Sequence, residues 1–297
     1  REQDPRFVAD LSQCLTVIPE IGTKVEALST FIESLDGKRD IPQIEFIAGD
    51  QAVVLTVRHL QPLSDADRAA WAAFGQQHGF VIYLQSGGVD TVQPLDGQGV
   101  PLSFRLAPWD VELAFRPLDF IQVNAKLNEK MIAHALDLLE PGEDERVLDL
   151  FCGLGNFSLP IAHQGAEVLG LEGESGLVER AHANAAANGL AERTGFEVAD
   201  LAAEEGELPG LSGADKLLLD PPRSGAMAVV KRLPAAREAA APSRVVYVSC
   251  NPATLARDAG YLTGPLGYRL SAAGIANMFP HTAHVESVAC FDRPGAD

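Results

Sequence analysis

The stretch Arg146-Val-Leu-Asp-Leu-Phe-Cys-Gly-Leu-Gly-Asn156 decides the fold, because it joins a short apolar strand to a glycine-rich turn. Glycines at this point permit a tight turn and let the backbone approach a ligand closely. From here to the end of the chain, strand and helix patterns alternate. The predicted strands are residues 146–151, 167–171, 195–199, 216–219, 245–249, about 268–276 and about 284–291, with helices between the first five and after the fifth.

This alternation predicts an α/β fold with a mostly parallel, doubly wound, Rossmann-like sheet. The last two strands are joined by a connection too short for a helical crossover, so we expect an antiparallel strand near the end. An amphipathic helix at residues 125–139 precedes the first strand. We therefore predict one α/β domain over residues 118–297.

The first third of the chain lacks this regular alternation. Its predicted elements are helices at residues 17–35 and 64–79, a hairpin at 44–57, a strand at 81–84 and a hairpin with strands at 102–106 and 111–115. Ser64 is the expected N-cap of the second helix, because acidic residues follow it in the first turn. The mixture predicts a smaller α+β domain over residues 1–117.

Composition limits the class of protein. The chain has 297 residues, a hydrophobic fraction of 46% and a net charge of −18, and no apolar run approaches the length of a membrane span. Four scattered cysteines without a CxxC pair indicate a reduced, cytoplasmic protein. The acidic balance disfavours tight, autonomous binding of nucleic acid, which needs Lys and Arg. The chain begins with Arg1 rather than Met, so we expect a piece of something longer.

Three acidic residues at strand ends point to a cofactor pocket. Glu172 ends the second strand, where a carboxylate can accept hydrogen bonds from ribose hydroxyls, and Asp200 closes the third strand, within reach of an adenine amino group. Both could instead be solvated strand-end carboxylates. The glycine turn alone leaves NAD open, but together with the rigid Asp220-Pro-Pro loop it fits S-adenosyl-L-methionine better. Arg223 follows this loop, where methyltransferases that act on amino groups usually have an aromatic residue.

Cys250 is the candidate nucleophile, because the strand 245–249 delivers its thiol to a carboxyl end and stops at Asn-Pro. The alternative is a small buried hydrophobic residue, the commoner fate of a lone cysteine. A thiolate that adds to carbon 6 of a pyrimidine makes carbon 5 nucleophilic towards a methyl sulfonium, and a base then removes the carbon 5 proton. Glu286 is the candidate base, because a carboxylate that begins an apolar strand is costly to bury without a function. His281 and His284 are its rivals.

Together these motifs resemble the RNA uracil-5-methyltransferase family, and within it the enzymes that make 5-methyluridine in 23S ribosomal RNA. The resemblance runs from about residue 115 to residue 291 through the stretches Pro117–Asn124, Val147–Asn156, Leu219–Arg223, Val246–Asp258 and Met278–Glu286. It implies a class I methyltransferase domain after a central, RNA-contacting domain. It also implies that S-adenosyl-L-methionine is the methyl donor.

The resemblance assigns roles to individual residues. Cys250 is then the nucleophile and Glu286 the base. The residues that match contacts to the methyl donor are Gln122, Phe151, Asn156, Glu172, Asp200 and Asp220. The expected partner is ribosomal RNA with its target uridine in a single-stranded or loop site, from which the base leaves its stack. No membrane and no protein partner is predicted.

The first third departs from the family. Relatives of the ribosomal group carry a [4Fe–4S] cluster on four cysteines, and Cys14 resembles the fourth ligand, but its three partners are not in this sequence. The basic amino-terminal RNA-binding barrel of the family is also missing. A cluster is therefore expected only in a longer chain. Two other functions stay open: an amine-directed methyltransferase that uses Asp-Pro-Pro, and a non-catalytic RNA-binding or assembly factor on a methyltransferase scaffold.

Overall fold

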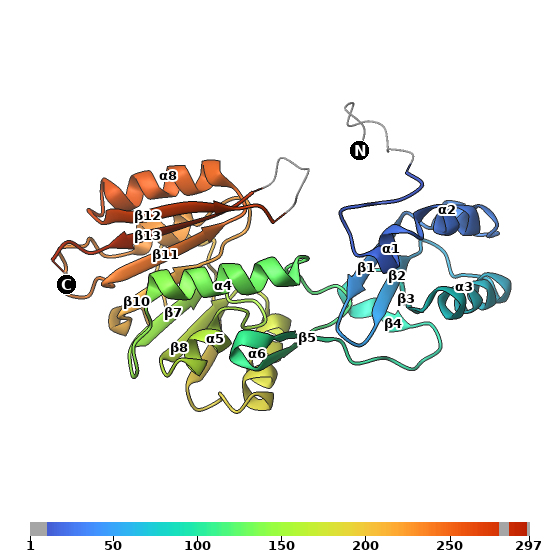
Figure 1. The fold of residues 1–297 in the computed structure, drawn as a ribbon, viewed down its shortest axis with the longest axis horizontal. Helices are drawn as coiled ribbons and strands as arrows, with labels where there is room; N and C mark the ends of the chain where they lie inside the picture. Colours follow the sequence, from blue (N-terminus) through green and yellow to red (C-terminus); the bar gives the residue numbers. More distant parts are fainter. Residues whose placement is uncertain (1–10, 279–284, 296–297) are drawn as a thin grey trace. The chain divides into compact units, whose positions relative to one another are not determined.

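The computed structural model describes residues 11–278 and 285–295. His281 and His284, the two rival bases, lie outside the described residues. The chain divides into two compact units, Arg1–Phe104 with Phe115–Asp119 and Arg105–Ala114 with Phe120–Asp297, and Figure 1 colours them in chain order. The role in RNA contact that we predicted for the first third stays a prediction.

The first unit is built on a four-stranded sheet in the order β1-β2-β3-β4. Its elements are α1 (Pro19–Gly22), α2 (Val25–Glu33), β1 (Gln43–Ala48), β2 (Val53–Arg58), α3 (Asp65–His78), β3 (Phe80–Gln85) and β4 (Gln93–Pro94). β1 and β2 form the predicted hairpin, and the Ser64 side chain caps α3 by accepting from the Asp67 amide at 3.1 Å. The stretch 17–35 is helical as predicted, but Thr23 and Lys24 separate it into two short helices. Gly22 at the end of α1 lets the backbone of residue 14 approach closely, because a Cβ there would lie only 2.1 Å from the Cys14 carbonyl oxygen.

Aromatic side chains form the core of this unit. Phe31 of α2 stacks on Phe74 of α3 with ring centroids 4.4 Å apart, and it meets the edge of Trp71 at 4.7 Å. Trp71 is fully buried, and Phe80 of β3 joins the same cluster. The two helices are therefore held to the sheet by one apolar cluster.

The second unit contains a seven-stranded sheet in the order β12-β13-β11-β10-β7-β8-β9. Its strands are β7 (Arg146–Leu150), β8 (Glu167–Glu172), β9 (Thr194–Val198), β10 (Lys216–Leu219), β11 (Arg244–Ser249), β12 (Arg269–Ala276) and β13 (Glu286–Asp292). Strands β7 to β11 run parallel, and β13 is antiparallel to both of its neighbours. The predicted doubly wound α/β sheet with an antiparallel strand near the end is confirmed.

Helices connect the parallel strands β7 to β11, with one exception, and α4 and α8 flank this run in the chain. The helices are α4 (Ala125–Leu139), α5 (Ser158–His163), α6 (Ser175–Ala187), α7 (Met227–Arg232) and α8 (Pro252–Thr263). The helix predicted between β9 and β10 is wrong: this fully described connection holds only a 3-10 turn at Leu211–Gly213. The run 204–210 combines adjacent glutamates with two glycines and a proline, which disfavours a helix.

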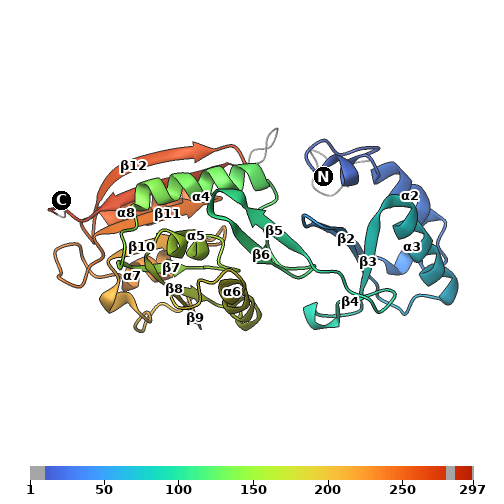
Figure 2. The same cartoon turned by 60° about the horizontal axis from the view of Figure 1, so that its bottom comes forward.

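A two-stranded ribbon, β5 (Ser103–Leu106) and β6 (Val111–Ala114), precedes this sheet and is visible in Figure 2. Helix α6 holds β6 through two side-chain amides. Asn184 accepts from the Ala114 amide at 2.9 Å and Asn188 accepts from the Glu112 amide at 2.8 Å. These amide groups of β6 thereby have hydrogen-bond partners although no further strand among the described residues pairs with this edge.

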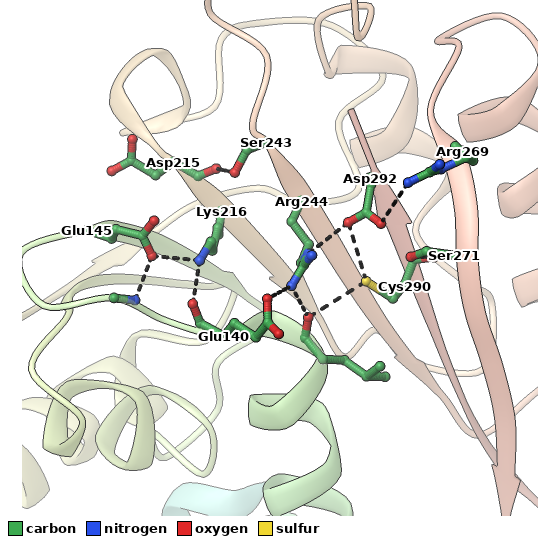
Figure 3. Close-up of polar contacts among 12 residues, drawn as sticks. Glu140, Glu145, Asp215, Lys216, Ser243, Arg244, Arg269, Ser271, Cys290 and Asp292 are labelled. Carbon is green, nitrogen blue, oxygen red and sulfur yellow. Dashed lines mark hydrogen bonds and ion pairs between the residues drawn. The ribbon is translucent and has the colours of Figure 1, made fainter. Parts of the chain in front are cut away.

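A polar network fixes the carboxyl end of α4 to the amino ends of β10 and β11, as Figure 3 shows. Arg244 donates to Asp292 at 2.7 Å, to Glu140 at 2.5 Å and to the Leu138 carbonyl at 2.9 Å. Lys216 pairs with Glu145 at 2.7 Å. Because positive side chains satisfy the last carbonyls of a helix, this network sets where α4 lies on the sheet.

Candidate active site

The predicted site residues of the second unit lie at or beyond the carboxyl ends of the parallel strands, in the segment before α4, or, for Glu286, at the start of the antiparallel β13. The strand order reverses between β10 and β7, which is the point where open α/β sheets bind ligands. The loops after β7, β8, β10 and β11 all begin at this edge. The antiparallel β13 begins here too, because Ser287 pairs with Ser249 at the end of β11.

The glycine loop after β7 makes a turn that ordinary residues rarely adopt. Gly153 and Gly155 have φ of 55° and 94°, and Phe151 has φ of 66° without being glycine. Phe151 and Cys152 donate their amides to the Leu171 carbonyl at 2.9 and 3.2 Å, which holds this backbone against β8. A non-glycine residue in the left-handed region stores strain, and such strain is typical of ligand sites.

Glu172 connects the tip of β8 to this loop. Its Oε2 accepts from the Gly153 amide at 3.1 Å, and its Oε1 accepts from the Gly173 and Glu174 amides at 2.7 and 3.3 Å. The carboxylate is half-buried beside the loop. Its contact with a ribose stays a prediction.

Asn156 is anchored by a partner that sequence reasoning did not find. Its side-chain amide makes a reciprocal pair with Asn128 of α4, with N···O distances of 2.8 and 3.1 Å. Asn128 is 1% exposed. Gln122 is half-buried in the segment just before α4, whose N-cap Asn124 accepts from the Leu127 amide at 3.2 Å. The one sequence signal that could have indicated Asn128 is a polar residue on the apolar face of an amphipathic helix.

Asp200 lies two residues beyond β9 and is exposed. Its Oδ1 accepts from the amides of Ala202 and Ala203 at 2.9 and 3.1 Å, so this oxygen closes a local turn. Asp200 thus has a structural role in this turn. Its predicted contact with an adenine amino group stays a prediction.

Two carboxyl groups interact at the switch point, Asp149, which is fully buried, and Asp220, which is partly exposed. Burial raises the pKa of Asp149 in β7 to about 7, helped by Glu172 and opposed by a 2.5 Å hydrogen bond from Ser158. Burial also raises the pKa of Asp220 to about 7, with contributions from Glu286 and Asp149. Asp149 lies in the glycine-loop motif, but no local sequence signal distinguishes it as a buried titratable group within its apolar strand.

Cys250 is held between two loops. Asn251 caps α8 by accepting from the Ala253 amide at 3.1 Å, and its side chain donates to the Arg223 carbonyl at 3.1 Å. Ser287 of β13 donates to the Ser249 carbonyl at 3.0 Å. The thiol between these contacts is half-buried rather than enclosed in packed hydrocarbon.

Charged groups surround the thiol. Burial raises the pKa of Cys250, Glu286 and Asp220 raise it further, and the charge and hydrogen bond of Arg223 lower it. The structure thus brings together four side chains from the loops after β10 and β11 and the start of β13. The resting sulfur is protonated at neutral pH, so any attack by it requires loss of the proton.

Glu286 is 3% exposed and begins β13 opposite Ala276 of β12. Burial raises the pKa of its carboxyl group, and Arg223 lowers it. A carboxyl group with a raised pKa is suited to exchange protons near neutral pH. Its assignment as the base stays a prediction.

The other cysteines have structural surroundings. Cys152 and Cys290 are buried, as expected for packed side chains. Cys14, the expected fourth cluster ligand, makes a 3.2 Å hydrogen bond with Thr16, which lowers the pKa of its thiol. In residues 11–278 and 285–295, no three His, Cys, Asp or Glu side chains are grouped closely enough to hold a metal ion.

A cavity of about 430 Å³ lies at the opposite edge of the sheet, at the amino ends of β7, β8 and β9. Its arginines have acidic partners: Arg146 approaches Glu167 at 3.6 Å, and Arg193 approaches Asp144 at 3.8 Å. None of the predicted site residues lines it. We therefore place the candidate site at the carboxyl edge, where the strained loop and the buried titratable groups are.

A family model described as tRNA (uracil-5-)-methyltransferase matches residues 21–209 and 211–293. The chain belongs to this family. It is 78% identical over 294 residues to the 23S rRNA (uracil(1939)-C(5))-methyltransferase RlmD of Stenotrophomonas maltophilia (strain K279a), and 64% identical to that of Xanthomonas axonopodis pv. citri (strain 306). The resemblance predicted from the motifs is confirmed.

Each of these alignments covers 99% of this chain but only 65% of the relative, so the chain spans about two thirds of the relatives it matches. Among solved structures, a tRNA (uracil-54, C5)-methyltransferase of Pyrococcus abyssi, in complex with S-adenosyl-L-homocysteine, is similar with a TM-score of 0.72. It is 28% identical, and the match covers 96% of this chain and 70% of that one. The fold is that of S-adenosylmethionine-dependent methyltransferases, as predicted. None of the described helices is both long and apolar enough to cross a membrane.

Proposed function

We propose that this protein transfers a methyl group from S-adenosyl-L-methionine to carbon 5 of a uridine in 23S ribosomal RNA, in the cytoplasm, through a covalent cysteine adduct. The observation that carries the proposal is the meeting of Cys250, Glu286 and Arg223 at the same carboxyl edge of the sheet from which the glycine loop begins. Family membership and the high identity to 23S ribosomal RNA enzymes support the substrate class.

The residues present fit a positively charged methyl donor. The donor supplies an electrophilic methyl group on a sulfonium. Asp149, Asp220, Glu172 and Glu286 form a row of carboxyl groups that interact with one another along the strand ends. Asp149 Oδ1 is buried and has no hydrogen-bond partner among the described residues. A cation at this row would relieve the repulsion between the carboxylates.

The proposed reaction begins when the Cys250 sulfur loses its proton and adds to carbon 6 of the uracil ring. The electron pair of the 5,6 double bond then becomes available at carbon 5 and forms the bond to the methyl carbon, while the bond from the methyl carbon to the donor's sulfur breaks and leaves S-adenosyl-L-homocysteine. Glu286 removes the proton from carbon 5, and elimination breaks the bond between sulfur and carbon 6 and restores the double bond. Arg223 stabilises negative charge on the sulfur during addition and elimination.

The test is methylation of 23S ribosomal RNA fragments with a labelled methyl donor. Cys250→Ala should abolish turnover while leaving S-adenosyl-L-homocysteine binding intact, and Glu286→Gln should accumulate a covalent protein–RNA adduct. Cys290→Ala, which removes a buried thiol of β13, is the matched control and should remain active. Methylation by Cys250→Ala would refute the nucleophile assignment.

The nature of the product separates the alternatives. Mass spectrometry of digested RNA distinguishes a methyl group on carbon 5 from one on an exocyclic nitrogen, as an amine-directed enzyme would leave. RNA that contains 5-fluorouridine should trap the adduct, because fluorine at carbon 5 cannot leave as a proton does. Binding of this RNA without an adduct would favour a non-catalytic RNA-binding factor.

A further inference from the structure

A polar network is centred on a buried carboxylate of α8, the helix that follows the candidate nucleophile in the chain. Asp258 of α8 is 0% exposed, and its Oδ2 accepts from the Tyr247 hydroxyl and from the Ala226 amide, both at 2.7 Å. Its Oδ1 accepts from Arg257 Nε, also at 2.7 Å. Three hydrogen-bond donors to one carboxylate offset the free energy that its burial costs in lost hydration. The Asp258 carboxylate is therefore held in one defined orientation by its partners.

The network holds the segment that follows Asp-Pro-Pro. Arg257 donates to the Ser224 carbonyl at 2.9 Å, and Asn251 donates to the Arg223 carbonyl at 3.1 Å. Gly225 has φ of 80°, and a Cβ there would lie 2.7 Å from both Arg257 Nη2 and Asp258 Oδ2. Side chains of α8 and of its cap therefore form hydrogen bonds to the backbone of three of the four residues 223–226. Gly225, which has no side chain, leaves the space that these contacts need.

Helix α8 does not need this network to attach to the sheet. Its residues Leu255 and Leu262 already pack in the main apolar cluster of the second unit. Apolar side chains of similar size at the positions of a buried ionic group often stabilise a protein as well or better. The acceptor oxygens of Asp258 are therefore needed where α8 meets the 223–226 segment, rather than to hold α8 on the sheet.

We propose that Asp258 is a positioning residue that fixes the 223–226 segment on α8, and thereby keeps the Arg223 guanidinium beside the Cys250 sulfur. The proposal rests on the function proposed above, in which Cys250 is the nucleophile. Asp258 touches no reacting atom; it acts through Arg223. The other charged groups that face the thiol, Glu286 and Asp220, oppose ionisation, so the position of Arg223 decides how readily the sulfur loses its proton.

The test measures the reactivity of Cys250 itself. The rate of iodoacetamide alkylation at Cys250 is followed from pH 6 to pH 10 by peptide mass spectrometry. Asp258→Asn keeps an oxygen for Tyr247 and Ala226 but turns an amide towards Arg257, which releases the segment. It should slow alkylation at pH 8 by about threefold to tenfold and move the midpoint upward, because each pKa unit changes the thiolate fraction tenfold. Tyr247→Phe leaves the Asp258–Ala226 bond in place and should change the rate less than about twofold.

A double-mutant cycle decides between positioning and a local structural effect. Arg223→Ala should slow alkylation as Asp258→Asn does, and the double variant should be no slower than Arg223→Ala alone. If Asp258→Asn fails to fold, Arg257→Gln, which changes a partly exposed residue, replaces it and should show the same non-additivity. An unchanged midpoint in the folded variant, or effects that add independently, would overturn the proposal.

Two results distinguish this proposal from the proposed function. If the unaltered protein forms no adduct with 5-fluorouridine RNA while the double-mutant cycle shows coupling, the proposed methyl transfer is refuted. The positioning of Arg223 by Asp258 is still supported in that case. If the adduct forms and the cycle shows no coupling, the positioning role fails alone. S-adenosyl-L-homocysteine affinity should be the same in every variant of the cycle, which excludes damage to the glycine loop.

Discussion

Asp149→Asn should make the ligand-free protein more stable at alkaline pH and remove part of the pH dependence of its stability. The Asp149 pKa is raised from 3.8 to about 7 in the folded protein by burial. Between these values the unfolded chain has lost a proton that the folded protein keeps, so stability falls as the pH rises through this window. The resulting penalty is about 2 kcal/mol at pH 5 and about 4 kcal/mol at pH 8.

The substituted amide does not ionise, but it has a cost of its own. Its oxygen can still accept from Ser158, whereas its NH₂ group replaces an oxygen that has no partner among the described residues. An unsatisfied buried donor costs about 1–3 kcal/mol at every pH. The net gain in the free energy of unfolding is therefore about 1–3 kcal/mol at pH 8 and close to zero at pH 5.

Urea denaturation at pH 5, 6, 7 and 8 measures this difference. The unaltered protein should lose about 2–3 kcal/mol more than Asp149→Asn between pH 5 and pH 8. Asp137→Asn, at an exposed position of α4, is the control and should show the pH dependence of the unaltered protein. If Asp149→Asn retained the full pH dependence, Asp149 would not be the buried group that titrates, and our account of the carboxyl row would be wrong.

Three further substitutions test the supports of the site. Gly155→Ala should cost about 1–2 kcal/mol in urea denaturation, because Gly155 has φ of 94° and the added Cβ would lie 3.2 Å from Leu159 Cγ; a neutral result would contradict the strained turn. Asn128→Ala removes both bonds to Asn156 and should cost about 1–3 kcal/mol, with weaker S-adenosyl-L-homocysteine binding in calorimetry; unchanged affinity would show that Asn156 needs no anchor. Arg244→Ala should cost about 1–2 kcal/mol, because Glu140 and Asp292 lose their shared partner while Arg269 stays near Asp292; unaltered hydrogen exchange at the end of α4 would contradict the role given to this network.

Local sequence signals predicted much of the fold. Alternation of strands and helices gave the order of the elements, and the Ser64 cap followed from one side chain and its neighbours. The antiparallel β13 followed from the length of one connection. These features depend on residues close in the chain, so they can be recognised without knowledge of tertiary contacts.

The missed features depend on contacts between distant residues. Asn128 and Asn156 are 28 positions apart, and Asp258 is 32 positions from Ala226. Neither pair carries a spacing rule that a sequence pattern would reveal. The helix expected between β9 and β10 was wrong for a different reason, because most connections in this fold class are helical and the composition of 204–210 was not weighed against that tendency.

The residue after Asp-Pro-Pro links the geometry of the site to its proposed chemistry. An aromatic side chain at position 223 would offer a flat surface to a base but no charge to the thiol. Arg223 instead lowers the pKa of both Cys250 and Glu286, while burial and the neighbouring carboxyl groups raise the pKa of the thiol. In the proposed reaction the same cation thus favours the form in which each group acts, the thiolate of Cys250 for addition and the carboxylate of Glu286 that later accepts the carbon 5 proton. Cys250 and Glu286 each act in their ionised form, so a positive charge at a fixed position serves both. The hydrogen bonds that α8 and its cap make to the backbone of residues 223 and 224 hold Arg223 in such a position.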